Sequence, residues 1–143
     1  MRLGRQILSL ALGFVVVAAT LAATPVSAGR HIVFKANGGP AQVRPATIYA
    51  SPTNGPYAKG LLWANWGEDR ATAEGTVYYD TCEPDCSAGY HSTSGEVVLS
   101  GVRRCGTQLR YSHLRIVYFP APQYNLRATY GCAGTATHVH IGR

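Results

Sequence analysis

The stretch "QLRYSHLRIVYF", residues 108–119, has the clearest period of two in the chain. Alternate side chains of a β-strand point to opposite faces. One face would carry Leu109, Tyr111, His113, Arg115, Val117 and Phe119, and the other Arg110, Ser112, Leu114, Ile116 and Tyr118. Apolar residues occur on both faces, which is typical of a strand covered on both sides. We therefore expect a small antiparallel β-sandwich or barrel rather than a single open sheet.

Similar stretches recur along the chain on both sides of this one. They are rich in Val, Ile, Thr, Tyr and Trp and are separated by clusters of Gly, Pro, Asn and Ser, a pattern that predicts an all-β fold. About seven strands are expected, at residues 43–50, 60–66, 71–81, 95–102, 108–119, 125–131 and 135–141. No window shows the i, i+3, i+4, i+7 spacing of an amphipathic helix.

The first 28 residues have the features of a secretory signal peptide. Arg2 and Arg5 precede an apolar run at residues 7–21, which ends before the small-residue tripeptide Val26-Ser27-Ala28. The run is shorter than the ~20 residues of a membrane-spanning helix, and no later stretch is as apolar. We expect a cleaved signal peptide at 1–28, a flexible arm at 29–42, a disulfide-stabilised β domain at 43–143, and secretion without a transmembrane segment.

The net charge of the secreted form is modest. Eleven Lys and Arg stand against seven Asp and Glu after residue 28, and only Arg103 and Arg104 are adjacent basic residues. A nucleic-acid-binding domain is expected to show a basic stripe, so nucleic acid is not an expected partner. Attraction to an anionic cell wall is compatible with this charge.

Four cysteines in a secreted chain of this size indicate two disulfides. The stretch "TCEPDCSAGYH", residues 81–91, holds Cys82 and Cys86, but no second close pair completes a zinc site. The two cysteines also lack the two-residue spacing of a thioredoxin-type redox motif. If the strands follow one another as a meander, Cys105 and Cys132 reach the same end of the sheet. The expected pairs are therefore Cys82 with Cys86 and Cys105 with Cys132.

Residues 60–105 resemble a family of small exported proteins of actinobacteria. The resemblance rests on a Trp-x-x-Trp-Gly stretch, an Ala-x-Gly-Thr step, a Cys-x-Pro-x-Cys-x-Ala-Gly loop and a later cysteine. The matching residues are Trp63, Trp66, Gly67, Ala73, Gly75, Thr76, Cys82, Pro84, Cys86, Ala88, Gly89 and Cys105. The family often has Asn and Ala where this chain has Asp85 and Ser87. The resemblance implies a secreted β-rich domain and brings no catalytic residue.

Four residues are candidates for a binding surface. Trp63 and Trp66 are three positions apart, so in an extended strand they would point to opposite faces, and one of them would be exposed. An exposed Trp would suit sugar stacking or protein docking, but the reading we favour is that both pack inside. Tyr90 and His91 follow the Cys82–Cys86 ring, which could present its loop rigidly; the reading we favour is a plain structural loop.

Three histidines are weak candidates for metal ligands. His138 and His140 would share one face of the last strand, but no third ligand is near in the sequence. Cleavage after Ala28 would place His31 third from a free amine, an arrangement that binds Cu(II) or Ni(II). No cofactor is expected.

The sequence contains none of the common catalytic motifs. The leading hypothesis is a secreted, non-catalytic binding domain, whose partner would be an extracellular protein or a cell-wall glycan. The alternatives are a protein resembling a protease inhibitor and a small secreted hydrolase.

Overall fold

A computed structural model describes residues 29–52, 55–81, 85 and 89–142. Eight strands form one sheet, and a single 3-10 turn, η1 (Pro122–Tyr124), is the only helical element of the described residues. The strands are β1 (Ile32–Phe34), β2 (Thr47–Tyr49), β3 (Tyr57–Ala64), β4 (Ala71–Tyr79), β5 (His91–Cys105), β6 (Gln108–Tyr118), β7 (Leu126–Tyr130) and β8 (Ala136–Ile141). None of the described segments forms a helix that could cross a membrane.

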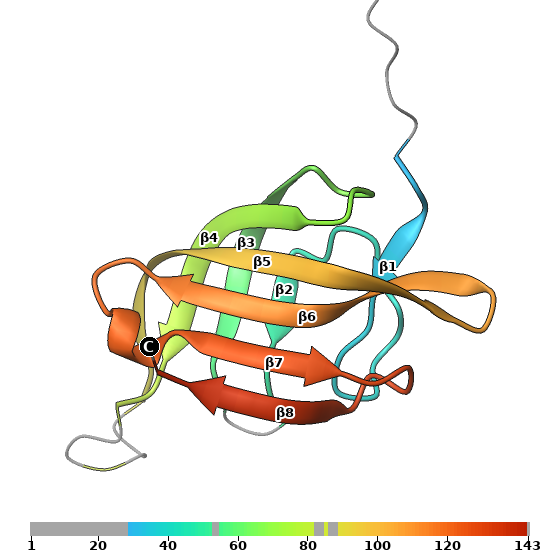
Figure 1. The fold of residues 1–143 in the computed structure, drawn as a ribbon. Helices are drawn as coiled ribbons and strands as arrows, with labels where there is room; N and C mark the ends of the chain where they lie inside the picture. The colour runs from blue at the N-terminus through green and yellow to red at the C-terminus, as the bar shows by residue number, and fades with distance from the viewer. Residues whose placement is uncertain (1–28, 53–54, 82–84, 86–88, 143) are drawn as a thin grey trace, which may run out of the picture.

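Strands β2 to β8 follow one another as an antiparallel meander, in the order β2-β3-β4-β5-β6-β7-β8. The sheet curls into a half-barrel, and β2, β3 and β4 cross behind β5 and β6 in Figure 1. The predicted all-β fold is confirmed, and the seven predicted strands correspond to β2 to β8. The predicted signal peptide lies outside the described residues.

The expectation of a loosely held arm at 29–42 is wrong for β1. This strand pairs in parallel with β6, with Ile32 opposite Leu109 and Phe34 opposite Tyr111. All three of its residues are buried. Two backbone hydrogen bonds, of 2.9 and 2.8 Å, then join Phe34 to Gln42. Three apolar residues are too few to show a period, and their partner strand is far away in the sequence.

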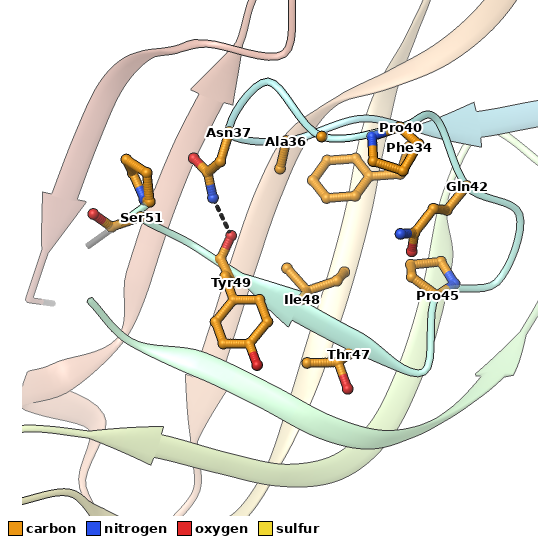
Figure 2. A pocket seen from close by; sticks show the side chains of 12 residues that line it. Phe34, Ala36, Asn37, Pro40, Gln42, Pro45, Thr47, Ile48, Tyr49 and Ser51 are labelled. Carbon is orange, nitrogen blue, oxygen red and sulfur yellow. Dashed lines mark hydrogen bonds between the residues drawn. The ribbon is translucent and has the colours of Figure 1, made fainter. Parts of the chain in front are cut away.

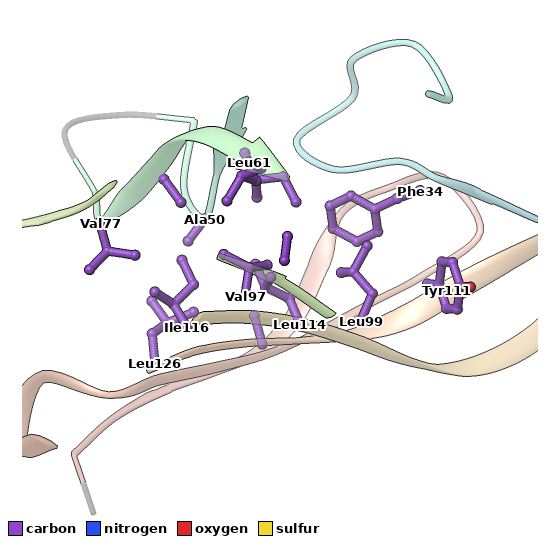
Figure 3. Packing of buried hydrophobic residues seen from close by; sticks show 14 of the residues in the cluster. Phe34, Ala50, Leu61, Val77, Val97, Leu99, Tyr111, Leu114, Ile116 and Leu126 are labelled. Carbon is purple, nitrogen blue, oxygen red and sulfur yellow. The ribbon is translucent and has the colours of Figure 1, made fainter. Parts of the chain in front are cut away.

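The core fills the concave side of the curled sheet (Figure 3). Strand β6 contributes Leu114, Ile116 and Tyr118 from one face and Tyr111 from the other. The face that β6 buries changes at Ser112, whose Oγ donates a 2.7 Å hydrogen bond to the carbonyl of Gly101. Gly101 has a φ of 67°, and a Cβ there would lie 2.8 Å from Ser112 Oγ. The apolar residues on both faces of β6 therefore do not require that the whole strand be covered on both sides. They also arise because β6 bends at Ser112 and buries a different face on each side of the bend.

The predicted disulfide between Cys105 and Cys132 is confirmed, with 5.4 Å between the two Cα atoms. It joins the end of β5 to the segment after β7. The side chains of Arg103 and Arg110 donate hydrogen bonds to the carbonyls of Tyr130 and Cys132 beside it. The predicted Cys82–Cys86 pair lies outside the described residues.

Candidate binding surface

Three tyrosines lie directly opposite one another on the convex face of the sheet. Tyr49 of β2 pairs with Tyr57 of β3, which in turn pairs with Tyr78 of β4. Because side chains alternate along each strand, the residues next to these tyrosines point into the core, and they are buried: Ile48, Ala58 and Val77. Burial of these neighbours fixes the tyrosines on the outer face.

The rings of these tyrosines contact one another. Tyr57 and Tyr78 stack with centroids 4.4 Å apart and planes 9° from parallel, and Tyr49 is 5.4 Å from Tyr57. Tyr90, just before β5, meets Tyr57 edge to face at 5.1 Å. We call Tyr49, Tyr57, Tyr78 and Tyr90 the tyrosine ladder. Tyr49 is 53% exposed and Tyr90 39%, so two of the four rings lie largely open to solvent.

A lysine lies over the centre of the ladder. Lys59 Nζ is 5.2 Å from the centroid of Tyr57 and 5.7 Å from that of Tyr78, within the range of a cation–π contact. Desolvation raises the pKa of Tyr90, and the electrostatic influence of Tyr57 and Asp80 raises it further. The ladder thus combines apolar ring faces, phenol hydroxyls and one lysine side chain.

A cavity of about 420 Å³ adjoins the Tyr49 end of the ladder (Figure 2). It lies between β2 and the loop that leads from β1. Asn37, which has a φ of 52°, donates a 2.6 Å hydrogen bond to the carbonyl of Tyr49 and holds the loop beside the strand. Its lining includes the buried Phe34 and Ile48, and the remaining lining residues are Ala36, Gly39, Pro40, Gln42, Pro45, Thr47, Ser51 and Pro52.

The two tryptophans do not point to opposite faces, where their spacing in an extended strand would have placed them. Their rings contact each other at 4.8 Å, and both are partly buried against the core. Strand β3 ends at Ala64, and Asn65 has a φ of 56°, which turns Trp66 back beside Trp63. The indole N–H groups of Trp63 and Trp66 donate to backbone carbonyls at 2.8 and 2.9 Å respectively. The favoured expectation, that both pack inside, describes them better.

Of the other two predicted binding residues, only Tyr90 joins the ladder. His91 instead stacks against Tyr79 at 5.7 Å, and Tyr79 stacks against Tyr124 at 4.6 Å. Tyr78 and Tyr79 are adjacent in β4 and so point to opposite faces. Tyr49, Tyr57 and Tyr78 were not among the residues predicted from the sequence, because Tyr57 lies before the strand expected at 60–66.

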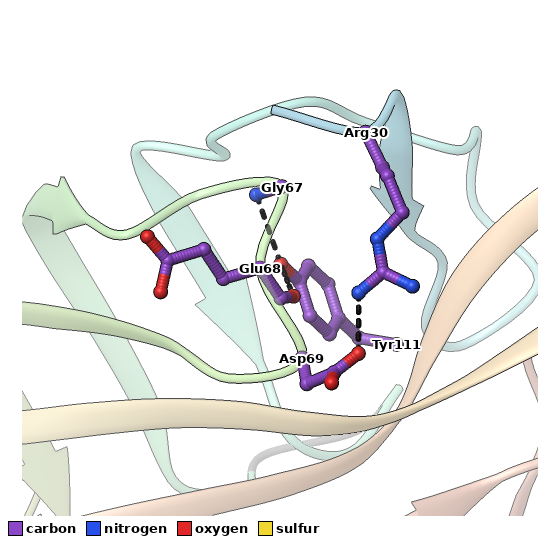
Figure 4. A network of polar contacts seen from close by, with 5 residues as sticks. All are labelled: Arg30, Gly67, Glu68, Asp69 and Tyr111. Atoms are coloured by element: carbon purple, nitrogen blue, oxygen red, sulfur yellow. Dashed lines mark hydrogen bonds and ion pairs between the residues drawn. The ribbon is translucent and has the colours of Figure 1, made fainter. Parts of the chain in front are cut away.

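A second, polar cavity of about 880 Å³ is lined by the start of the described chain and the β3–β4 turn. Figure 4 shows polar contacts of residues that line it with the buried Tyr111: the Tyr111 hydroxyl accepts from the Gly67 N–H at 3.1 Å and donates to the Glu68 carbonyl at 2.8 Å. Burial raises the pKa of Tyr111. Arg30 forms an ion pair with Asp69. These contacts hold the turn against β6, which is a structural role.

The candidate metal ligands lie in two places. His31 is exposed at the second cavity. His138 and His140 are exposed on β8, opposite Thr129 and Arg127. Within the described residues, no three His, Cys, Asp or Glu side chains gather closely enough to hold a metal ion.

No family model, curated protein or solved structure matches this chain. A function for it therefore has to rest on its own residues and their geometry. The feature that most resembles a prepared ligand surface is the tyrosine ladder with the cavity at its end.

Proposed function

We propose that the protein is a secreted, non-catalytic binding domain whose tyrosine ladder holds an extended glycan, such as a cell-wall polysaccharide. The observation that carries the proposal is the contact of four tyrosine rings across neighbouring strands. Tyrosine combines an apolar ring with a polar hydroxyl, which suits a sugar ring with its C–H faces and hydroxyls. The Cys105–Cys132 disulfide supports a location outside the cell.

The surroundings of the ladder favour a glycan over a protein partner. The outward positions next to it carry small hydroxyl side chains, namely Thr47, Thr76, Ser92 and Ser94. Protein interfaces concentrate their binding energy in desolvated apolar pockets, whereas a hydroxyl-lined face can exchange hydrogen bonds with a sugar polymer. The cavity beside Tyr49 would receive a substituent that projects from the polymer.

The hydrolase alternative has less support. Glu74 lies directly opposite Glu96 on the outer face of β4 and β5. Neither carboxylate lines either of the two cavities. A hydrolytic site is expected to be concave and to bring titratable groups together around the substrate. The inhibitor alternative rests on a loop that lies largely outside the described residues.

The proposal is tested by retention on insoluble peptidoglycan and on insoluble polysaccharides such as chitin and cellulose. The double variant Tyr57→Ala, Tyr78→Ala should bind about 5- to 150-fold more weakly, because each aromatic contact contributes about 0.5–1.5 kcal/mol. Phe119→Ala is the matched control, since Phe119 is an exposed aromatic residue outside the ladder. Equal retention of both variants, or no retention of the unaltered protein on any of these polymers, would overturn the proposal.

A further inference from the structure

Acidic and basic residues are distributed unevenly along the chain. All seven Asp and Glu lie between residues 68 and 96, and none occurs from residue 97 onward, although arginines and histidines continue. Strands β6, β7 and β8 therefore contain cationic or titratable basic side chains and no carboxylate. This asymmetry suggests an anionic partner for that part of the sheet.

The sheet register brings three of these side chains into one row. Arg115 of β6 lies directly opposite Arg127 of β7, which lies directly opposite His140 of β8. The three strands are neighbours in Figure 1. We call Arg115, Arg127 and His140 the cationic row. A second register row, His113, Thr129 and His138, runs beside it.

The cationic row forms no ion pair within the described residues, although Glu96 of β5 lies diagonal to Arg115 in the sheet register, opposite Val117. Like charges directly opposite each other on adjacent strands destabilise a sheet. The single ion pair found in the described residues joins Arg30 to Asp69, away from this row. In addition, Arg115 Nε is buried and has no hydrogen-bond partner. A buried donor without an acceptor is costly and calls for an explanation.

We infer that the cationic row is a binding site for a phosphate-type oxyanion, carried by a phosphodiester-linked polymer at the cell surface. Arginine guanidinium groups bind phosphate through two parallel hydrogen bonds. An oxyanion between Arg115 and Arg127 would remove their repulsion, and a small rotation of Arg115 would give its Nε an acceptor. The spacing of neighbouring strands, about 4.8 Å, lets an extended polyanion contact the whole row.

A nucleic acid fits this face less well. Sites for single strands combine positive charge with aromatic rings on which bases stack. Around the row, the outward positions of β6–β8 are occupied by His113, Val117, Thr129 and His138. The one exposed aromatic residue near these positions in the described chain is Phe119, just beyond the end of β6, and a single ring is a small platform for stacked bases. This site is separate from the tyrosine ladder, which lies on β2–β4, so either can exist without the other.

The test uses the secreted chain, residues 29–143, with three probes in calorimetric titrations: inorganic pyrophosphate, a synthetic glycerol-phosphate oligomer and a DNA oligonucleotide of equal charge. Arg127→Thr should weaken binding of pyrophosphate and of the glycerol-phosphate oligomer at least tenfold. Arg70→Thr, which removes an exposed charge elsewhere, should not. Equal affinity of the two variants, no binding of either phosphate probe, or tighter binding of DNA than of the oligomer would overturn the inference.

A second measurement separates a binding role from a structural one. Without any oxyanion, Arg127→Thr should have the same or a higher melting temperature than the unaltered protein, because it removes repulsion within the row. Added pyrophosphate should then raise the melting temperature of the unaltered protein and of Arg70→Thr, but not that of Arg127→Thr. A variant destabilised without oxyanion would show that Arg127 is needed for folding and would contradict the inference.

Discussion

The hydroxyl of Tyr130 donates a 3.0 Å hydrogen bond to the backbone carbonyl of Ala50, which joins β7 to the segment after β2 across the core. Both residues are buried, and the Tyr130 ring meets Phe34 of β1 edge to face at 5.4 Å. One side chain therefore connects three parts of the curled sheet. Its removal tests whether the half-barrel depends on contacts across its core.

Tyr130→Phe should lower the free energy of unfolding by about 1–3 kcal/mol, because the Ala50 carbonyl would lose its buried donor. Urea unfolding followed by circular dichroism measures this change. Tyr49→Phe is the control, since the Tyr49 side chain is exposed and its hydroxyl makes no contact in the core. An equal loss in both variants would show that the effect comes from removing any hydroxyl.

Alkaline pH should destabilise the protein through its buried tyrosines. Burial raises the pKa of Tyr130 from 10.0 to about 12 and raises that of Tyr118 strongly as well. Between pH 10 and 12, the Tyr130 phenol of the unfolded chain has lost its proton while that of the folded chain keeps it. The contribution of Tyr130 to the free energy of unfolding is therefore fully present below pH 10 and is lost as the pH rises toward 12. Midpoints of urea unfolding from pH 8 to 11 would show it. In Tyr130→Phe the urea midpoint should fall less steeply with pH. If the midpoint falls as steeply as in the unaltered protein, ionisation of Tyr130 is not the cause.

Much of the fold could be predicted because period-two patterns report which face is buried. They revealed seven strands and, through the meander, the Cys105–Cys132 pair. They did not reveal β1, whose three residues make a parallel pairing with distant β6. They also placed the start of β3 too late, at Gly60. Gly60 has a φ of 65° and lies at a register shift between Lys59 and Leu62, which interrupts the alternation.

That late start concealed the candidate site. With β3 starting at residue 60, Tyr57 fell into a predicted loop, and its alignment with Tyr49 and Tyr78 could not be seen. Register depends on turn geometry and on bulges, which a single sequence specifies poorly. The cationic row was hidden for the same reason, although the absence of acidic residues after residue 96 was visible.

The disulfide should contribute a large share of the stability. On the chain-entropy model, closing a ring of this length contributes about 3.5 kcal/mol, since Cys105 and Cys132 are 27 positions apart. The double variant Cys105→Ala, Cys132→Ala should lose roughly this amount in urea unfolding at pH 7. Reduction of the unaltered protein should give a similar loss. A loss below about 1 kcal/mol would mean that the unfolded chain is already compact in this region.

Strand β1 should matter far more than the ion pair that lies beside it. Phe34→Ala removes a buried ring and should cost about 3–5 kcal/mol of unfolding free energy. Arg30→Ala breaks a pair whose side chains are 50% and 88% exposed, so it should cost less than about 1 kcal/mol. Comparing the two variants separates the role of the buried strand from that of the surface charge. Similar losses would mean that β1 is held mainly by Arg30.

Ligand binding at the ladder should leave the tryptophan emission unchanged. Trp63 is six residues from Tyr57 along β3, which corresponds to roughly 20 Å. Both indole N–H groups already bind backbone carbonyls, so a ligand on the ladder has no reason to disturb them. Emission excited at 295 nm, where tyrosine absorbs little, should therefore stay constant during titration with a soluble fragment of a retained glycan. The contrary result is saturable quenching in the unaltered protein that persists in the double variant Tyr57→Ala, Tyr78→Ala. Because that variant lacks the central rings of the ladder, such quenching would place the ligand at the tryptophan pair.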